Sequence, residues 1–229
     1  MSAQSHDQEL AVILISGGMD SLVTAAYALQ SYRGAFLHID YGQRTAGQEK
    51  SCFTALVAHY KPEFHQIFEL PWLGNIGGSA LTDHTISVPQ TLTTSTHIPV
   101  TYVPFRNSIM LSTAVAWAEV IGASVIFYGA VEADSAGYPD CRQKYVAAFN
   151  QLITVGTARV SIEIQAPLIT MSKKEIVLLG AKLQVPFELT WSCYTQAKRA
   201  CGLCESCRLR LEAFSRAGLP DPLPYQTRP

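Results

Sequence analysis

The string Ser16-Gly-Gly-Met-Asp-Ser21 could bind phosphate groups, because it places glycines and hydroxyls directly after an apolar run. Two glycines let the backbone turn sharply and approach a ligand closely. If a helix follows, its first N–H groups and the serine hydroxyls point to the same place, which is how proteins bind phosphate. The alternative phosphate loops, G-x-x-x-x-G-K-[ST] and G-x-G-x-x-G, do not occur in the sequence. A glycine pair alone often marks only a tight turn, so the specific signal is the complete S-G-G-x-D-S string.

Four of the six cysteines gather near the C-terminal end, at Cys193, Cys201, Cys204 and Cys207. The C-x₂-C-x₂-C core can close around one metal ion, and Cys193 can return as the fourth ligand. Four thiolates are typical of a closed, tetrahedral structural zinc site. The same core also opens the ferredoxin pattern, so an iron–sulfur cluster is the alternative. Of the remaining two cysteines, Cys52 is expected in the core, and Cys141 is expected either to pack or to take part in catalysis.

Three further polar strings come after predicted strands or at the start of a predicted helix. Asp40-Tyr-Gly-Gln-Arg44 follows the second strand, Pro104-Phe-Arg-Asn107 starts a helix, and residues 129–142 (GAVEADSAGYPDCR) follow the fourth strand. The carboxyl ends of parallel strands meet at one edge of a sheet, where ligands bind. Each string alone could be a polar surface loop. Together, on one edge, they indicate a binding site shared with the glycine loop.

The complete S-G-G-x-D-S string, between a strand and a helix, resembles the pyrophosphate loop of the N-type ATP pyrophosphatase (PP-loop) family. Members of that family have the adenine-nucleotide α-hydrolase fold and split ATP between its α and β phosphates. They adenylate a carbonyl-type oxygen and let a nucleophile displace AMP. DYGQR, GYPDCR and the cysteine cluster narrow the resemblance to the 7-cyano-7-deazaguanine synthase family of queuosine precursor biosynthesis, over about Leu10 to Phe214. The sequence departs from that family at Phe105, where glycine is common, at Ala136, where serine is common, and at Met19, which replaces a frequent glutamine.

This resemblance implies a ligase that forms C–N bonds. It implies that 7-carboxy-7-deazaguanine and ammonia are converted to 7-cyano-7-deazaguanine by two successive ATP-dependent adenylations, from acid to amide to nitrile, with release of AMP and pyrophosphate. It further implies Mg²⁺ bound with ATP, a homodimer, and one structural zinc ion per chain rather than an iron–sulfur cluster.

The resemblance and the positions of the strings together give a set of expected site residues. Asp20 would help to place Mg²⁺, and an acidic side chain would face the guanidine-like edge of the deazapurine, which presents donors. Lys173 would contact phosphate, or else be a solvated lysine at a helix end. The expected ATP-binding residues are Ile15, Ser16, Gly17, Gly18, Met19, Asp20, Ser21, Leu22, Val23, Thr24, Ala25, Asp40, Tyr41 and Lys173. The expected substrate-binding residues are Arg106, Asn107, Glu132, Gly137, Tyr138 and Asp140. The expected catalytic residues are Asp20, Arg44, Arg106, Glu132 and Asp134, and the expected zinc ligands are Cys193, Cys201, Cys204 and Cys207.

Alternating strands and helices must position these residues. Short apolar runs predict buried strands, and 3.6-residue periodicity between them predicts helices. The predicted strands cover residues 10–15, 35–39, 64–70, 124–128 and 161–166, and the predicted helices cover 20–31, 47–60, 107–121, 143–156 and 173–183. The alternation predicts an α/β fold, a Rossmann-like doubly wound parallel sheet of the adenine-nucleotide α-hydrolase type. Ser172 and Glu175 match a helix capping box.

The chain divides into three predicted parts. Residues 1–9 are expected to be a disordered tail, 10–188 an ATP pyrophosphatase α/β domain, and 189–229 a small helical zinc-binding module with a tail. Inside the domain, the stretch from Pro71 to Arg106 is rich in glycine, proline and threonine, and is expected to be a long loop. A loop of that length is usually a lid or a binding loop, and the alternative is a surface insertion.

Composition excludes several classes of protein. The 229 residues are 48% apolar and 15% charged with a formal net charge of −1, which suits one folded domain and argues against a disordered chain. A protein that grips nucleic acid needs a basic excess, so no nucleic-acid partner is expected, and no apolar run is long enough to predict a membrane span. The polar first residues lack a signal sequence, so a cytoplasmic location is expected.

The alternative function is that of another PP-loop enzyme, either amidotransferase-like or tRNA-modifying. A tRNA-modifying enzyme would need a basic face, and the amide-forming relatives lack this cysteine module.

Overall fold

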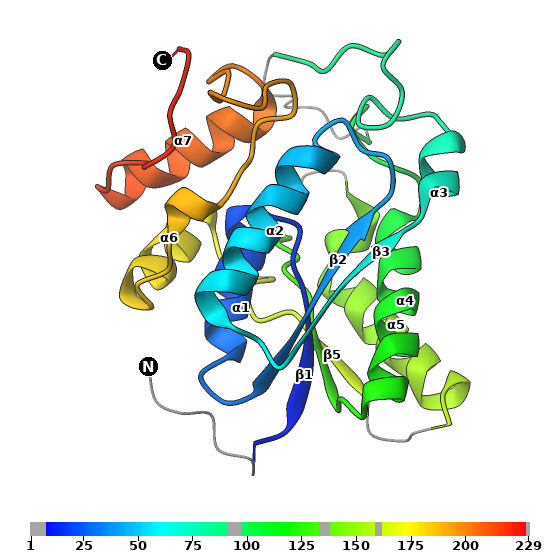
Figure 1. The fold of residues 1–229 in the computed structure, drawn as a ribbon. Coiled ribbons are helices and arrows are strands. Elements are labelled where there is room, and N and C mark those ends of the chain that lie inside the picture. Colours follow the sequence, from blue (N-terminus) through cyan, green and yellow to red (C-terminus); the bar gives the residue numbers. More distant parts are fainter. Residues whose placement is uncertain (1–7, 91–97, 133–137, 159–161, 228–229) are drawn as a thin grey trace.

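A parallel β-sheet forms the centre of the molecule (Figure 1). The computed structural model describes residues 8–90, 98–132, 138–158 and 162–227. Within these residues the sheet has five strands in the order β3-β2-β1-β4-β5, and every neighbouring pair is parallel. The strands are β1 (Leu10–Leu14), β2 (Arg33–Asp40), β3 (Phe64–Glu69), β4 (Val125–Phe127) and β5 (Glu163–Gln165). The strand order reverses between β1 and β4, which confirms the predicted doubly wound sheet.

Helices cover both faces of this sheet, as Figure 1 shows. One face carries α1 (Met19–Ala28), α2 (Ala46–Tyr60) and α6 (Lys173–Lys182), and the other carries α4 (Arg106–Ile121) and α5 (Gln143–Gly156). Helix α7 (Glu205–Ala217) packs beside α6. The remaining helices are short: α3 (Pro71–Asn75) and the 3₁₀ helices η1 (Pro139–Cys141) and η2 (Phe187–Leu189).

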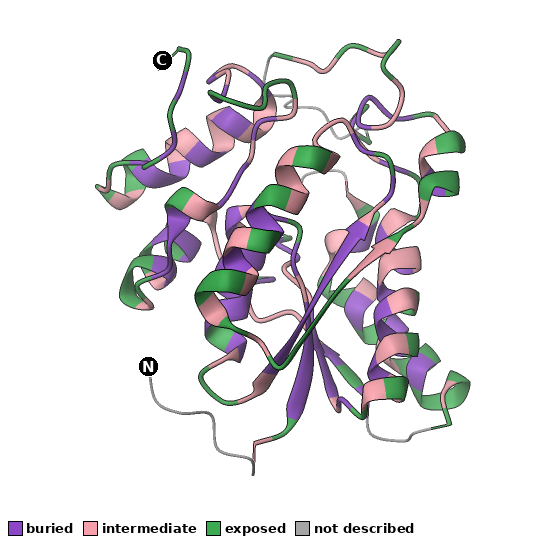
Figure 2. Ribbon diagram, in the orientation of Figure 1, coloured by how far each residue is buried: buried purple, intermediate pink, exposed green. Residues whose placement is uncertain are grey.

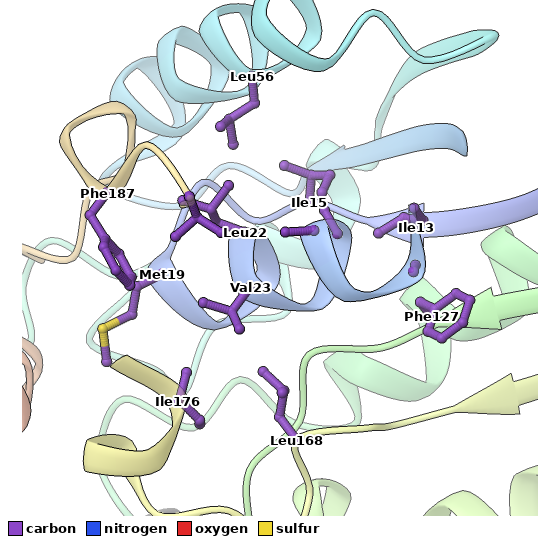
Figure 3. Close-up of a cluster of buried hydrophobic side chains, with 14 of the residues drawn as sticks. Ile13, Ile15, Met19, Leu22, Val23, Leu56, Phe127, Leu168, Ile176 and Phe187 are labelled. Carbon is purple, nitrogen blue, oxygen red and sulfur yellow. The ribbon is translucent and has the colours of Figure 1, made fainter. Parts of the chain in front are cut away.

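Alternate residues of β1 enter two separate cores. Ile13 packs with residues of α1, α6 and β4, whereas Val12 packs with residues of α4 and α5. Figure 3 shows the first core, where Leu22 and Phe127 lie around the end of β1. The central strands are therefore buried on both faces, as the purple segments of Figure 2 show. Burial on both faces explains why residues 10–15 form a continuous apolar run rather than an alternating one.

The predicted capping box at the start of α6 is confirmed. Ser172 Oγ accepts a hydrogen bond from the Glu175 N–H at 3.3 Å, and Glu175 Oε2 accepts one from the Ser172 N–H at 2.8 Å. The box fixes where α6 begins and so places Lys173 at the first position of the helix.

The stretch from Pro71 to Arg106 was expected to be a loop throughout, and this expectation is wrong at its start, where α3 forms. Pro71 suits the first turn of a helix because its missing N–H needs no partner there. The helix has five residues and buries Leu73, so it has too little periodicity to be recognised from sequence. Beyond it, Leu81 and Thr101 line the candidate site described below.

The C-terminal segment shares the main core. Ala213 and Phe214 of α7 belong to the same buried cluster as Ile13, and the Phe214 ring lies 5.0 Å from that of Phe187. The proposed domain boundary after residue 188 remains a prediction. Among the residues described, no helix combines the length and the apolar character needed to cross a membrane.

Candidate active site

A cavity of about 570 Å³ lies at the carboxyl ends of β1 and β4, where the strand order reverses. Its walls come from the loops after β1, β2 and β4, from the first turns of α1, α4, α6 and α7, and from residues 191–194. In open α/β sheets ligands bind at such a reversal. Segments far apart in the sequence therefore meet at one chemical site.

The glycine loop is shaped to receive an anion. Gly17 has a left-handed backbone with φ of +83°, a conformation that strains residues with a side chain. Ser16 Oγ accepts from the Gly18 N–H at 3.3 Å and donates to Ser21 Oγ at 3.2 Å. No side chain caps α1 at its N-cap residue, Gly18, so the helix leaves its first N–H groups for another acceptor. The loop can therefore bind phosphate through backbone N–H groups and hydroxyls.

Asp20 and Lys173 form an ion pair beside this loop. Lys173 Nζ lies 2.6 Å from Asp20 Oδ2. The other carboxylate oxygen, Asp20 Oδ1, is buried and has no hydrogen-bond partner among the described residues. A buried carboxylate oxygen without a partner, next to a phosphate-binding loop, fits a hard divalent cation that travels with the phosphates.

A second cation, Arg106, lies at the start of α4, a helix on the other face of the sheet from α1 and α6. Its Nη1 donates to the Tyr41 hydroxyl at 3.0 Å, and its guanidinium carbon lies 5.5 Å from the centre of the Tyr41 ring. Its Nε donates to Asn107 Oδ1 at 3.2 Å. Burial opposes the charge of Arg106, but its interaction with Tyr41 keeps its pKa above the usual value. Arg106 is therefore a permanent positive charge that can meet a carboxylate or phosphate.

Partly buried phenols line the same side of the cavity. Tyr138 shares a 2.6 Å hydrogen bond with Thr101 Oγ1, and Tyr128 OH donates to the Asp140 carbonyl at 3.1 Å. Burial raises the pKa of Tyr128 well above its usual value, and it also raises the pKa of Tyr138 and of Tyr194. At neutral pH these hydroxyls keep their protons. They form an amphipathic wall suited to a flat heteroaromatic ring.

Asp140 lies next to this wall, between the lining residues Tyr138 and Cys141. It is 3% exposed, and its Oδ1 has no hydrogen-bond partner among the described residues. Burial raises the pKa of Asp140, and the charge of Arg106 partly opposes that shift. Shifted carboxyl groups beside a pocket are typical of functional sites.

Glu132, Arg44 and Asp40 were expected in the site but do not line the cavity, and neither does Gly17 of the glycine loop. Glu132 Oε2 accepts from the Gln143 N–H at 3.0 Å, so it caps the start of α5. Arg44 donates to the carbonyls of Ala80 at 2.5 Å, Asp83 at 2.7 Å and Ile86 at 2.8 Å, and so holds the stretch that follows α3. Asp40 Oδ2 lies 2.6 Å from Lys50 Nζ. Burial opposes ionisation of Asp40, but Lys50 and the Gly42 N–H hold its pKa below the usual value.

The remaining expected residues divide in the same way. The ones that line the cavity are Ile15, Ser16, Gly18, Met19, Asp20, Ser21, Tyr41, Arg106, Asn107, Tyr138 and Lys173. Part of the Met19 side chain also packs beside Phe187 in the core, as Figure 3 shows. The residues that point elsewhere in α1 are Leu22, Val23, Thr24 and Ala25, of which the three apolar ones belong to the main core. Asp134, Ala136 and Gly137 lie outside the described residues.

The four C-terminal cysteines form a candidate metal centre. Their four sulfur atoms all lie within 4.8 Å of one another. Backbone N–H groups donate to these sulfurs: Cys201 N–H to Cys193 Sγ at 3.3 Å, and Leu203 and Cys204 N–H to Cys201 Sγ at 3.3 and 3.2 Å. Such hydrogen bonds stabilise thiolates and orient metal ligands. The cluster can therefore hold a metal ion.

Several lining residues were missed by sequence reasoning, namely Thr101, Tyr128, Trp191, Ser192, Tyr194, Glu205, Ser206 and Arg210. Most of them flank the cysteines, which sequence analysis considered only as metal ligands. A polar or aromatic residue next to a metal ligand is a signal that could have found them, because a metal centre holds its neighbours in place.

The chain is similar to several known proteins. The family model described as "Queuosine biosynthesis protein QueC" matches residues 10–218. A 7-cyano-7-deazaguanine synthase of Chlorobium chlorochromatii (strain CaD3) is 51% identical over 221 residues, which cover 96% of this chain and 97% of the relative. That of Koribacter versatilis (strain Ellin345) is 50% identical over 232 residues, covering 100% of this chain and 98% of the relative. Among solved structures, the U34-tRNA thiolase NcsA from Methanococcus maripaludis with its [4Fe-4S] cluster has a TM-score of 0.48 and 15% identity, and covers 91% of this chain and 65% of that one.

Proposed function

The chain belongs to the queuosine biosynthesis protein QueC family, and we propose that its central cavity converts 7-carboxy-7-deazaguanine, ammonia and ATP to 7-cyano-7-deazaguanine. The reaction is that of a C–N bond-forming ligase. The observation that carries the proposal is that one cavity is lined both by the glycine loop and by Arg106, Asn107 and Tyr138. A nucleotide and a flat acid can therefore meet there.

The glycine loop would bind the pyrophosphate part of ATP. Ser16, Gly18 and Ser21 line the cavity, and the start of α1 adds N–H groups without a capping side chain. Asp20 Oδ1, which is buried and has no partner among the described residues, would hold Mg²⁺. When it is bound, Mg²⁺ supplies charge neutralisation on the phosphates. Lys173 would then bring its positive charge to the same phosphates.

Two activations are needed, because a carboxylate is a poor electrophile. A carboxylate oxygen of the substrate attacks the α-phosphate of ATP, pyrophosphate leaves, and an acyl adenylate forms. Ammonia adds to its carbonyl carbon and loses a proton as AMP leaves, which gives the amide. The amide oxygen then attacks the α-phosphate of a second ATP, and pyrophosphate leaves. Loss of AMP and of the two nitrogen-bound protons leaves the nitrile.

The residues of this chain would act mainly by positioning and by stabilising charge. Arg106 would hold the substrate carboxylate or the α-phosphate, with Tyr41 and Asn107 fixing its orientation through the hydrogen bonds described above. The negative charge of Asp140 would favour the same orientation of Arg106, because the two opposite charges attract each other. Arg44 would act at a distance by holding the stretch that carries Leu81 against the cavity.

The metal at the four cysteines would be zinc, one ion per chain. A tetrahedral ion with zinc–sulfur bonds of about 2.3 Å separates its sulfurs by about 3.8 Å. Cys201 Sγ and Cys207 Sγ are 3.9 Å apart, and all four sulfurs lie within 4.8 Å of one another. An iron–sulfur cluster places metal atoms and sulfides between its thiolates and needs them farther apart. Zinc has no open position in such a site, so its role would be structural.

A second copy of the chain would complete the assembly. Val120 of α4 and Leu152 and Val155 of α5 are 81%, 57% and 83% exposed, and these two helices cover the face of the sheet opposite to α1, α6 and α7. Sedimentation of the purified protein would test the homodimer. None of the six cysteines, all of which are among the described residues, forms a disulfide, and this together with the use of ATP supports a cytoplasmic location.

A product assay tests the function itself. Purified protein is incubated with ATP, Mg²⁺, ammonium and 7-carboxy-7-deazaguanine, and the products are identified by mass spectrometry. The proposal requires the nitrile and AMP, and requires both to disappear when any one component is left out. ADP in place of AMP would contradict the assignment of the glycine loop to pyrophosphate.

A further inference from the structure

Phe105, the residue before Arg106, has a left-handed backbone, with φ of +57° and ψ of 16°. Residues with a side chain rarely adopt this region, and a bulky residue there is strained. Among the described residues, two other non-glycine residues have positive φ, Lys61 and Gln184, and both follow the end of a helix, where a left-handed residue is common. Phe105 instead precedes the start of a helix, where an extended conformation is usual. Another contact must therefore hold its conformation.

Tyr102 supplies that contact. The Phe105 N–H donates to the Tyr102 hydroxyl oxygen at 3.1 Å. The next N–H, that of Arg106, donates to the Val103 carbonyl at 3.2 Å. A phenylalanine side chain has no acceptor with which to cap a helix, so the Tyr102 hydroxyl takes the place of a capping side chain at the start of α4. Val103 is 3% exposed and packs with Tyr41, which anchors the turn in the interior.

The conformation of Phe105 determines where the guanidinium of Arg106 lies. Arg106 is the first residue of α4, and from there its Nη1 donates to the Tyr41 hydroxyl at 3.0 Å. The Phe105 carbonyl also accepts from the Ile109 N–H at 3.3 Å, so Phe105 belongs to the hydrogen bonding of the first turn. A change in the Phe105 backbone would therefore move both the start of α4 and the side chain of Arg106.

Tyr102 also contacts the aromatic wall of the cavity. Its ring lies 6.1 Å from that of Tyr138 in an edge-to-face arrangement. Its neighbour in the chain, Thr101, shares the 2.6 Å hydrogen bond with the Tyr138 hydroxyl. Thr101, Arg106 and Tyr138 are lining residues of the cavity, whereas Tyr102 is not. Tyr102 would therefore act through its neighbours and not by touching a ligand.

A hydroxyl that stabilises a strained residue next to a cation of the site points to one role. Resting on the function proposed above, we propose that Tyr102 is a positioning residue, which holds Phe105 in its left-handed conformation and so directs Arg106 toward the carboxylate of 7-carboxy-7-deazaguanine. Sequence analysis noted Phe105 only as a departure from the family pattern. Glycine adopts the left-handed conformation without strain. The need for the Tyr102 hydroxyl should therefore depend on which residue stands at position 105.

The experiment measures that dependence. Calorimetry gives the Kd of 7-carboxy-7-deazaguanine and, separately, of ATP, for the wild-type protein, Y102F, F105G and the double variant Y102F/F105G. We expect Y102F to weaken binding of the acid about tenfold, because one hydrogen bond is lost and the strained turn relaxes. F105G and the double variant should differ from each other by less than about threefold, because glycine needs no support there. The Kd of ATP should stay within about twofold of wild type in each variant, because the glycine loop binds the phosphates.

Two matched variants separate backbone freedom from other effects. F105A removes the same ring but keeps a Cβ, so Y102F should still weaken binding of the acid about tenfold when it is combined with F105A. Y27F removes the hydroxyl of an exposed tyrosine of α1 that does not line the cavity, and it should leave both Kd values unchanged. Thermal melting shows whether each variant is folded. If Y102F alone is unfolded, a folded Y102F/F105G that binds the acid like F105G supports the proposal, and an unfolded one overturns it.

The proposal is also overturned if Y102F binds the acid like wild type, or if Y102F weakens binding equally with phenylalanine and with glycine at position 105. It is overturned as well if F105A abolishes the effect of Y102F as fully as F105G does, or if ATP affinity falls in parallel with that for the acid. If wild type binds no deazapurine and makes no nitrile, the proposed function fails; if it does both and Y102F matches it, only the role of Tyr102 fails.

Discussion

The backbone N–H of Trp191 donates a 2.8 Å hydrogen bond to the carbonyl of Gly17 and so joins the cysteine-bearing segment to the phosphate loop. Trp191 is 6% exposed, and its indole Nε1 donates to the carbonyls of Cys193 at 3.0 Å and Gln196 at 3.1 Å. One residue therefore contacts the glycine loop through its backbone and the metal-binding loop through its side chain. The metal centre and the phosphate loop should depend on each other.

Replacing a metal ligand should disturb ATP binding. C207S removes one of four thiolates, so we expect the metal content to fall from one ion per chain and the melting temperature to drop by about 10 °C. Because Trp191 links the two sites, we also expect the Kd of ATP to rise about tenfold while the protein remains folded. Elemental analysis, thermal melting and calorimetry give the three quantities. Loss of the metal with an unchanged ATP affinity would show that the link has no energetic consequence.

Asp20 should be needed for turnover and not for the metal centre. D20N removes the charge that pairs with Lys173, and it removes one carboxylate oxygen from a group whose Oδ1 has no partner among the described residues. We expect the rate of AMP formation to fall by about 100-fold or more, because the groups that place charge on the phosphates are disrupted. Elemental analysis should find the zinc content unchanged. If zinc is lost as well, the separation of the two sites is wrong.

The buried pair of Arg210 and Asp221 should carry much of the stability of the C-terminal segment. Arg210 Nε and Nη2 donate to the two Asp221 oxygens at 2.9 and 3.0 Å, and the side chains are 1% and 2% exposed. D221N would leave a buried guanidinium without its counter-charge, so we expect the free energy of unfolding to fall by about 3–5 kcal/mol. Urea unfolding measures this change.

The control for that experiment lies on the same helix. Glu212 and Arg216 form an exposed pair at 2.6 Å, and E212Q should change the free energy of unfolding by no more than about 0.5 kcal/mol. Equal effects of D221N and E212Q would contradict the assigned importance of burial.

Patterns confined to short stretches of the chain could be predicted from sequence. The capping box at Ser172, the turn at Gly17 and the first strand depend on neighbours within a few residues, so they could be predicted. The strand was predicted over 10–15 and is found at Leu10–Leu14. The close approach of the four cysteines was predicted for the same reason, since three of them share one short string.

Assignments that depend on where distant elements pack could not be made in this way. Glu132 lies in the polar string at residues 129–142, but it caps α5 because that helix starts beside it. Arg44 lies in the polar string Asp40–Arg44, but its guanidinium donates hydrogen bonds to the carbonyls of Ala80, Asp83 and Ile86. Glu205 is hidden between two metal ligands, and only the placement of α7 brings it to the cavity. A spacing pattern shows which residues share an edge, but it does not show which of them already have a partner.

Asp140 should make stability depend on pH. Its pKa is raised above the ordinary value of 3.8 by burial, so the native state binds its proton more tightly than the unfolded state does. The stability that this carboxyl contributes is therefore fully present below about pH 4 and is lost as the pH rises through the native pKa. We expect D140N to gain stability relative to wild type between pH 4 and pH 7, as measured by urea unfolding. A difference that does not change with pH would contradict the shift. D140N should also slow turnover.

The ratio of AMP to nitrile tests the central claim most directly, because two adenylations in one cavity have a fixed stoichiometry. Purified protein is supplied with limiting 7-carboxy-7-deazaguanine, excess ATP, Mg²⁺ and ammonium, and AMP, amide and nitrile are quantified over time by mass spectrometry. The account predicts that the amide rises and then falls, and that about two AMP are formed for each nitrile, because each activation consumes one ATP. A single AMP for each product, with the amide as the end point, or nitrile formed without AMP, would contradict it.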